Sequence, residues 1–367
     1  MNKRAAPWVR LRDLLAHPQA LALGVVLLLF FLLLAVAGDL LAPLLAATII
    51  AYLLDPMVRH LERQGVRRLW AVVVVFGVFS GLLAATVFAL VPLLSRQLIQ
   101  WLEGLPALIA NGQALLLQLS RRYPQLFSAE QVTSMIHGFG ADLLAWRQVI
   151  LAHSLSFGKG LAVALVYLFL VPVLVFFMLK DKENILQWFG RFIPADNRLI
   201  RIVWHEVDQQ TGNYLRGTLW RMLAMGVLAL ISYGLLGIHY VALLATIIGL
   251  AVLVPYVGAV MALLPLVAIA YGQWGFTPLF WYALLIFAIL QILDGNLLAP
   301  LILAGTVDLH PVAIITAILF FGGIWGFWGI FFAIPLATLL NAVLLAWREL
   351  QEMVAQEQQH DEQQHTP

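Results

Sequence analysis

The chain has 367 residues, of which 62% are hydrophobic and only 11% are charged. A soluble domain has roughly 45–50% apolar and about 25% charged residues, so the composition excludes an ordinary soluble protein and predicts an integral membrane protein. The formal net charge of +2 gives no basis for nucleic-acid binding, and the absence of cysteine excludes disulfides and thiolate metal sites.

The first apolar residues follow a basic segment, residues 1–20, which we interpret as a cytoplasmic N-terminal segment rather than a cleaved signal peptide. A membrane-spanning helix needs roughly 20 mostly apolar residues. Two shorter runs, 21–37 and 40–54, are separated only by Gly38 and Asp39. This pattern predicts a tight hairpin of two spans.

Further spans follow along the chain, so that 21–94 holds three spans with a basic cytoplasmic loop at 55–69. The segment 95–157 has leucines at helical spacing, which predicts amphipathic extracytoplasmic helices lying on the membrane or on a partner subunit. A fourth span is expected at 158–179.

The last part of the chain begins with 180–221, where apolar residues at helical spacing predict an amphipathic cytoplasmic segment. The block 222–347 is almost continuously apolar and holds about four spans, which gives about eight in total. The tail 348–367 is polar and low in complexity, and we expect it to be disordered and cytoplasmic.

Positive charge predicts the orientation of the spans, because short loops rich in lysine and arginine stay in the cytoplasm. Counting the early hairpin as two crossings places sixteen of the 21 lysines and arginines on one side of the membrane. Both termini are therefore expected to be cytoplasmic.

Motifs of soluble enzymes are absent from the sequence. There is no GxxxxGK[ST] phosphate loop and no GxSxG nucleophile elbow, and the segment HEVDQ at His205 lacks the second histidine of a zinc-protease helix. We expect no enzymatic activity, no ATP hydrolysis, no metal and no cofactor.

Polar residues inside the apolar block are the candidates for a substrate pathway, because ionisable residues at membrane depth are rare and usually functional. The segment LQILDGNLLAP contains Gln291, Asp294, Asn296 and Pro300. Gln291 and Asp294 lie one helical turn apart and would share a face. A polar break that lines the pathway is one interpretation, and a loop at the membrane surface is the other.

Helix breakers mark a second part of the expected pathway, where VPYVGAVMALLP places Pro255, Gly258 and Pro265 in one span. Neither proline can donate to the helical hydrogen-bond ladder, so a broken or re-entrant helix is predicted. A kink that only improves packing is the alternative.

The segment TVDLHPV places Asp308 and His310 before Pro311, which suits the first turn of a helix. Asp308 is expected to cap that helix. The alternative is a proton or cation site made by Asp294, Asp308 or His310, since histidine titrates near neutral pH.

Glycines are concentrated in FFGGIWGFWGIFFAIP, residues 320–335. On one helix Gly322, Gly326 and Gly329 would form a small-residue stripe, which predicts close packing of two membrane helices. The alternative is a hinge in this stretch, with Pro335 ending it.

These segments together resemble the autoinducer-2 exporter family, and within it the PerM-type permeases. The resemblance covers essentially residues 20–347 and includes VPVLVFFMLKDKENI and NYLRGTLWRM. The second of these contains Tyr214, Arg216 and Gly217, which we expect at the cytoplasmic mouth.

The resemblance implies an eight-span, all-α protein of the bacterial inner membrane that transports without ATP. It also implies a homo-oligomer, for which a pentamer is our working expectation. Some relatives are assigned export of the signal autoinducer-2, others sodium/proton antiport, and many have no assigned substrate.

Three hypotheses for function follow. The first is a permease that moves a small polar solute, with export as the default direction. The second is a sodium/proton antiporter in which Asp294 or Asp308 carries the proton. The third is a non-transporting scaffold whose polar helices, in 95–157 and 180–217, bind partners.

Overall fold

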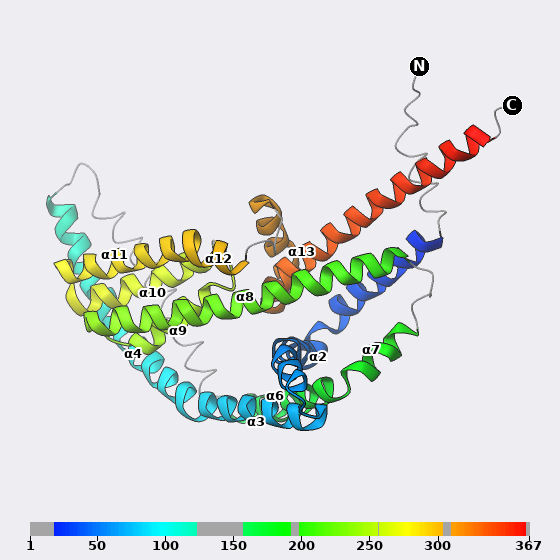
Figure 1. Ribbon diagram of the computed structural model, residues 1–367. Helices are drawn as coiled ribbons and strands as arrows, with labels where there is room; N and C mark the ends of the chain where they lie inside the picture. Colours follow the sequence, from blue (N-terminus) through cyan, green and yellow to red (C-terminus); the bar gives the residue numbers. More distant parts are fainter. Residues whose placement is uncertain (1–17, 123–156, 192–197, 256, 304–309, 365–367) are drawn as a thin grey trace, which may run out of the picture. The chain divides into compact units, whose positions relative to one another are not determined.

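The computed structural model describes residues 18–122, 157–191, 198–255, 257–303 and 310–364 as helices joined by short turns (Figure 1). No strand occurs in these ranges, and the predicted all-α class is confirmed. The chain divides into two compact units. The first unit comprises Met1–Val75, Leu170–Thr218 and Leu303–Pro367, and the second comprises Phe76–Phe169 and Leu219–Ile302.

The first unit is built on six helices or parts of helices: all of α2 (Pro18–Arg63), α7 (Lys182–Gly190) and α13 (Pro311–Gln364), with parts of α3 (Arg68–Ala85), α6 (Phe157–Lys180) and α8 (Arg198–Leu236). A buried apolar cluster joins α2, α8 and α13. It consists of Tyr214, Leu215 and Ile334, packed against Ile49, Tyr52, Leu53, Ile314 and Phe331.

The hairpin predicted at Gly38 and Asp39 is wrong, because α2 continues through both residues as one helix of 46 residues. A single glycine costs a helix only about 1 kcal/mol relative to alanine, and a membrane offers the backbone no water to replace a broken hydrogen bond. The basic loop expected at 55–69 is also shorter, because α2 ends at Arg63 and α3 begins at Arg68.

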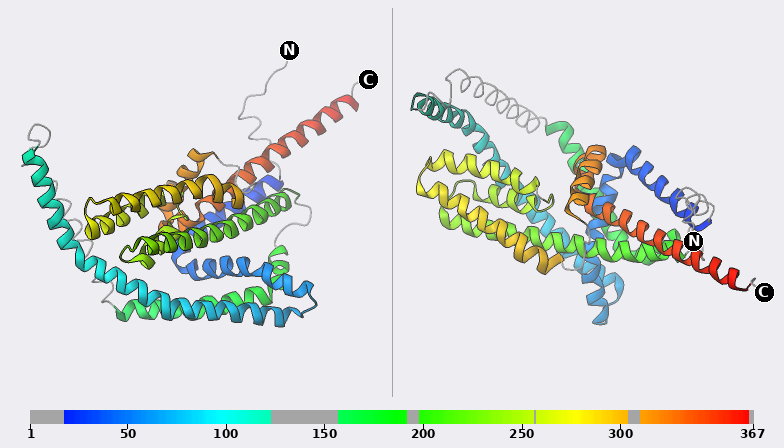
Figure 2. Two further views of the ribbon diagram at one scale, coloured as in Figure 1. Left: turned by 60° about the vertical axis from the view of Figure 1, so that its left-hand side comes forward. Right: turned by 90° about the horizontal axis from the view of Figure 1, so that it is seen from above.

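The second unit contains the remaining elements, and in both views of Figure 2 the second half of α8 lies beside three of them, α9, α10 and α11. The elements are the end of α3, the π-helix η1 (Thr86–Leu90), α4 (Val91–Arg122), α9 (Val241–Ala251), α10 (Val257–Trp274), α11 (Pro278–Leu293), the π-helix η2 (Asp294–Leu298) and α12 (Ala299–Leu303). Four fully buried alanines let these helices approach closely: Ala229, Ala262, Ala270 and Ala283.

An amphipathic helix is present where 95–157 predicted one, but it packs on its own chain. It belongs to α4, which contacts α9 and α10 and buries Leu102 and Leu105. The Gln97 Oε1 atom accepts a hydrogen bond of 2.8 Å from the Leu243 N–H, one of the groups left free at the start of α9. The helix runs unbroken through residue 95, and residues 123–156 lie outside the described ranges.

The broken helix predicted at Pro255 is confirmed. The helix α9 has only 11 residues, about 16 Å, which is shorter than the roughly 30 Å hydrocarbon core. The chain turns at 252–255, and α10 then packs back against α9. A Cβ atom on Gly258 would overlap the Ala251 carbonyl, so only glycine allows this approach. Pro265, in contrast, lies inside α10 without ending it.

The glycine stripe predicted in 320–335 is wrong as a feature of one straight helix, because α13 is sharply bent at Gly326 (Figure 1). Gly326 has φ 57° and ψ −133°, a conformation that favours glycine. Residues eight apart on a straight helix are about 12 Å apart. Here a Cβ atom on Gly329 would overlap the Phe321 carbonyl, so the two arms of α13 fold back against each other.

The second arm of α13 extends further than expected. Pro335, which was expected to end the glycine-rich stretch, lies inside the helix. The tail predicted to be disordered continues the same helix to Gln364. Its run of glutamine, glutamate and alanine consists mostly of strong helix formers, so a helix that enters the tail from the apolar segment can continue through it.

Among the described residues, five helices are long and apolar enough to cross a membrane: Leu41–Arg63, Arg68–Ala114, Gln210–Leu236, Val257–Trp274 and Pro278–Ile302. Four shorter apolar helices accompany them: Tyr167–Lys180, Val241–Ala251, Pro311–Gly326 and Trp328–Ala342. This pattern agrees with a helical membrane protein in which some helices are broken.

Candidate functional site

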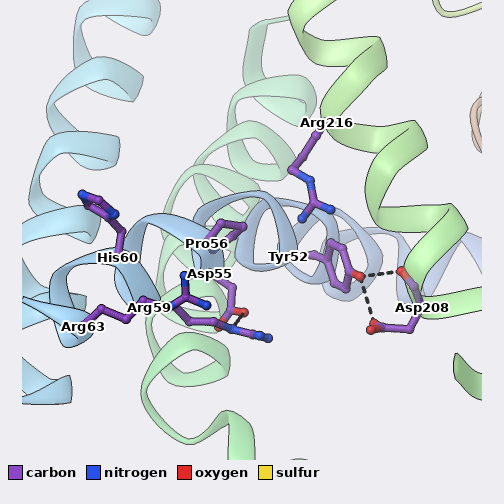
Figure 3. Close-up of a pocket in the computed structure, with 8 residues that line it drawn as sticks. All are labelled: Tyr52, Asp55, Pro56, Arg59, His60, Arg63, Asp208 and Arg216. Carbon is purple, nitrogen blue, oxygen red and sulfur yellow. Dashed lines mark hydrogen bonds and ion pairs between the residues drawn. The ribbon is translucent and has the colours of Figure 1, made fainter. Parts of the chain in front are cut away.

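A polar pocket of about 430 Å³ lies in the first unit, between the last turns of α2 and the first half of α8 (Figure 3). Such a volume is in the range of small-molecule sites, roughly 300–1,000 Å³. The pocket is lined by Tyr52, Asp55, Pro56, Arg59, His60, Arg63, Asp208 and Arg216. Seven of these eight side chains are polar or charged, in a chain that is 62% hydrophobic.

Tyr52 joins the two helices that form the pocket. Its hydroxyl oxygen lies 2.6 Å from the Asp208 carbonyl oxygen and 2.9 Å from the Asp208 Oδ1, and it donates to this pair of acceptors. The Tyr52 ring fits against Gly212, where a Cβ atom would come within 2.5 Å of the ring. Glycine at this position therefore makes room for the tyrosine.

Asp55, three residues after Tyr52 on α2, also lines the pocket and binds two cations. Its Oδ2 accepts a hydrogen bond of 2.7 Å from Arg59 Nε and another of 2.7 Å from Lys182 Nζ on α7. The aspartate is only 6% exposed, and its Oδ1 is buried without a hydrogen-bond partner in the described structure. A carboxylate with this little contact with water requires paired cations, so Asp55 holds α7 to α2.

Arg68 ties the start of α3 to the end of α6. Its Nη2 donates to the Leu179 carbonyl at 2.8 Å, which satisfies one of the free carbonyls at a helix C-terminus. The same guanidinium lies 3.4 Å from a Glu62 carboxylate oxygen. The basic segments predicted on one side of the membrane, around Arg68 and Lys182, therefore meet in the first unit.

The predicted cytoplasmic mouth divides into one pocket residue and two packing residues. Arg216 lines the pocket, where its guanidinium lies 6.0 Å from the centre of the Tyr52 ring and donates to Asn213 Oδ1 at 2.9 Å. Tyr214 and Gly217 are buried instead, and Tyr214 belongs to the apolar cluster of the first unit.

Asp294 is paired with Arg221, which the sequence pattern assigns to the cytoplasmic segment 180–221. Arg221 of α8 donates from Nε to Asp294 Oδ1 at 3.0 Å and from Nη2 to Oδ2 at 2.7 Å. Both side chains are 13% exposed, and both lie within apolar helices long enough to cross a membrane. This bidentate pair joins α8 to the π-helix η2, where the backbone hydrogen bonds after α11 change from the α-helical to the π-helical pattern.

The other predicted pathway residues of the second unit make no comparable contact. Asn296 donates at 3.0 Å to the Ile292 carbonyl of its own helix, and Gln291 is half-buried. Pro300 is exposed on α12. The structure confirms a disturbed helix here, because η2 replaces a regular α-helical turn, and it excludes a loop.

Of the predicted pair Asp308 and His310, the structure describes only His310. Asp308 lies outside the described residues. His310 precedes α13, and its Nδ1 accepts a hydrogen bond of 3.3 Å from the Val312 N–H. Because a side chain that accepts from the second helical residue acts as an N-cap, His310 holds the place expected of Asp308.

Sequence reasoning missed most of the pocket. The sequence pattern predicts Tyr52 at the end of a hairpin and the other three, Asp55, Arg59 and His60, in a basic loop. All four occupy the last turns of α2. The positive-charge count was the available signal, since it already placed these arginines on the same side as Arg216. Among the described residues, no group of three histidine or acidic side chains is arranged to hold a metal.

Comparisons with known proteins agree on one family. The family model described as "AI-2E family transporter" matches residues 23–349. The Escherichia coli protein named "Putative permease PerM" is 40% identical over 350 residues, which cover 95% of this chain and 98% of that protein. The Bacillus subtilis protein named "Putative transport protein YueF" is 28% identical over 309 residues, 83% of each chain.

Proposed function

This chain belongs to the AI-2E transporter family, and on that premise we propose that it moves a small polar organic solute across the bacterial inner membrane without hydrolysing ATP. Its relatives are named as permeases and transport proteins. The general role is therefore that of a multi-pass membrane transport protein. The cargo, its direction and the coupling are the proposal.

The observation that carries the proposal is the polar pocket of the first unit. Its lining offers guanidinium donors from Arg63 and Arg216 and acceptors from Asp208, as the recognition of a polar solute requires. Autoinducer-2 is the first candidate cargo, and export is the proposed direction.

Conduction through the second unit is assigned to its helix breaks. We propose that the interrupted helices at Pro255 with Gly258, and at Asp294, border the pathway, because irregular backbone at membrane depth is tolerated only inside protein or along a water-filled cavity. Gln291, Asn296, Pro265 and Pro300 remain candidates for the same pathway.

The arrangement of Asp294 favours solute transport over sodium/proton antiport. Both carboxylate oxygens are occupied by Arg221. A sodium ion that took the place of Arg221 at Asp294 would leave a guanidinium with no other acidic partner among the described residues, and so a charge unpaired in the membrane.

Orientation and assembly are also proposals. The loop with Arg67 and Arg68 is placed in the cytoplasm by its positive charge, and the C-terminus is assigned to the same side. A cytoplasmic N-terminus requires two crossings within 21–54, which the unbroken α2 does not provide. A homo-oligomer, with a pentamer as the working expectation, follows from the family.

Flux through purified protein in liposomes tests the proposal. We expect autoinducer-2 to leave loaded proteoliposomes faster than protein-free liposomes, and Arg216→Gln to slow this efflux at least tenfold, because the pocket loses a charged donor. Arg67→Gln is the matched control, since Arg67 is exposed, lies in the turn between α2 and α3 and does not line the pocket.

Three outcomes decide between the hypotheses. Unchanged efflux in Arg216→Gln would remove the pocket from recognition. A pH change driven by sodium pulses, lost in Asp294→Asn, would establish antiport instead. No flux of any tested solute by folded protein would support the scaffold.

A further inference from the structure

Resting on the proposed function, we propose that the pocket of the first unit is an oxyanion site. Its ligand is a small organic molecule that carries a phosphate or carboxylate group. The inference deepens the proposed function because it names a charge class for the solute, which neither the family nor its named relatives supply. It places phosphorylated and carboxylated solutes ahead of autoinducer-2, which carries neither group.

The first argument is the balance of charge around the pocket. Three arginines line it beside two carboxylates, Asp55 and Asp208, and Lys182 neutralises part of the Asp55 charge from the neighbouring helix. The resulting excess of positive charge attracts an anion.

The second argument is that both carboxylates are already engaged. Asp55 binds Arg59 and Lys182 through one oxygen, at 2.7 Å each. The Asp208 Oδ1 accepts from the Tyr52 hydroxyl at 2.9 Å. Two separated carboxylates that each have protein donors do not form a cation site, so the acids complete the wall and Arg63 and Arg216 remain to meet a ligand.

The third argument is that two arginines of the pocket have no acidic partner among the described residues. Within the described part of the chain, no acidic side chain pairs with Arg63 or Arg216, although both face the pocket (Figure 3). Arg216 is half-buried and positioned by Asn213 and by the face of Tyr52. A planar guanidinium offers paired N–H donors whose geometry matches phosphate or carboxylate.

The size of the pocket favours an organic anion over a bare inorganic ion as the ligand. A volume of about 430 Å³ is many times the roughly 30 Å³ that one water occupies in the liquid. An anion bound only by its charged group would leave most of this space to water. The same oxyanion chemistry is found in free phosphorylated or carboxylated solutes and in the headgroups of anionic lipids.

Binding is tested by calorimetry on purified full-length protein, with glycerol 3-phosphate and succinate as anionic probes and glycerol as the neutral match. We expect glycerol 3-phosphate or succinate to bind and glycerol not to bind. Arg216→Gln and Arg63→Gln should each weaken anion binding at least tenfold, whereas Arg67→Gln should leave it unchanged. Repeating the titration in nanodiscs of phosphatidylcholine with and without phosphatidylglycerol distinguishes a soluble anion from a lipid headgroup as the ligand.

Each outcome has one meaning. Competition by phosphatidylglycerol, abolished in Arg216→Gln, identifies a lipid headgroup as the source of the anion, and equal binding in both nanodiscs identifies a soluble anion. Absence of anion binding and of phosphatidylglycerol competition overturns the inference, as does equal binding by Arg216→Gln. Efflux of autoinducer-2 without anion binding would contradict only this inference. Anion binding without flux of any solute would contradict only the proposed function.

Discussion

Replacing Gly329 with alanine is expected to destabilise the protein by more than about 3 kcal/mol, at or beyond the upper end of the cost of overpacking. The added Cβ would meet the Phe321 carbonyl carbon and oxygen, which are backbone atoms and cannot rotate away. The bend at Gly326 brings these arms together, so the variant must open the bend. Thermal unfolding in detergent, followed by size-exclusion chromatography, measures the effect.

Gly323→Ala is the matched control for this prediction. Gly323 lies on the first arm of the same bend, and a Cβ atom there meets nothing within 4 Å. Because alanine is the better helix former, we expect the control to be as stable as the parent or slightly more stable. Equal melting temperatures for Gly329→Ala and Gly323→Ala would mean that α13 is straight.

Removing one member of the pair between Arg221 and Asp294 is expected to cost about 3–5 kcal/mol, because the remaining charge stays buried without a partner. Arg221→Met and Asp294→Leu should each lower the melting temperature strongly. The double variant should recover most of that loss, since it buries no charge. Asn296→Ala, whose side chain bonds only to its own helix in the described structure, is the control.

Exchanging Arg221 and Asp294 distinguishes a structural role of the pair from a role in the transport pathway. If the pair only joins α8 to η2, the variant with Arg221→Asp and Asp294→Arg should restore both stability and solute efflux. Additive losses in the double variant, in place of recovery, would show that the two side chains do not interact. Restored stability without efflux would place Asp294 itself on the pathway.

The sequence predicted those features of the fold that depend on local chemistry. The apolar runs predicted membrane helices, and Pro255 predicted the break between α9 and α10, because proline cannot continue the ladder. The basic segments around Arg68 and Lys182, predicted on one side of the membrane, meet in the first unit. These inferences need only composition, periodicity and the chemistry of single residues.

The sequence could not predict features that depend on contacts between distant segments. Gly326 reads as one position of a small-residue stripe, and only its φ of 57° shows that the chain turns there. Asp294 reads as a lone acid, since nothing local identifies Arg221, 73 positions away, as its partner. The polar pocket likewise requires α2 and α8 to meet, and the distance along the chain between Tyr52 and Asp208 conceals that contact.

Thiol labelling tests most directly the central claim that the pocket of the first unit binds the transported solute. The chain has no cysteine, so single cysteines can be placed at will. We predict that a thiol-reactive cation blocks efflux from proteoliposomes carrying Pro56→Cys, at the pocket wall, and that bound solute slows the block. Met57→Cys, at a residue that is 57% exposed and does not line the pocket, should label without loss of efflux. Full efflux after complete labelling of Pro56→Cys would contradict the account.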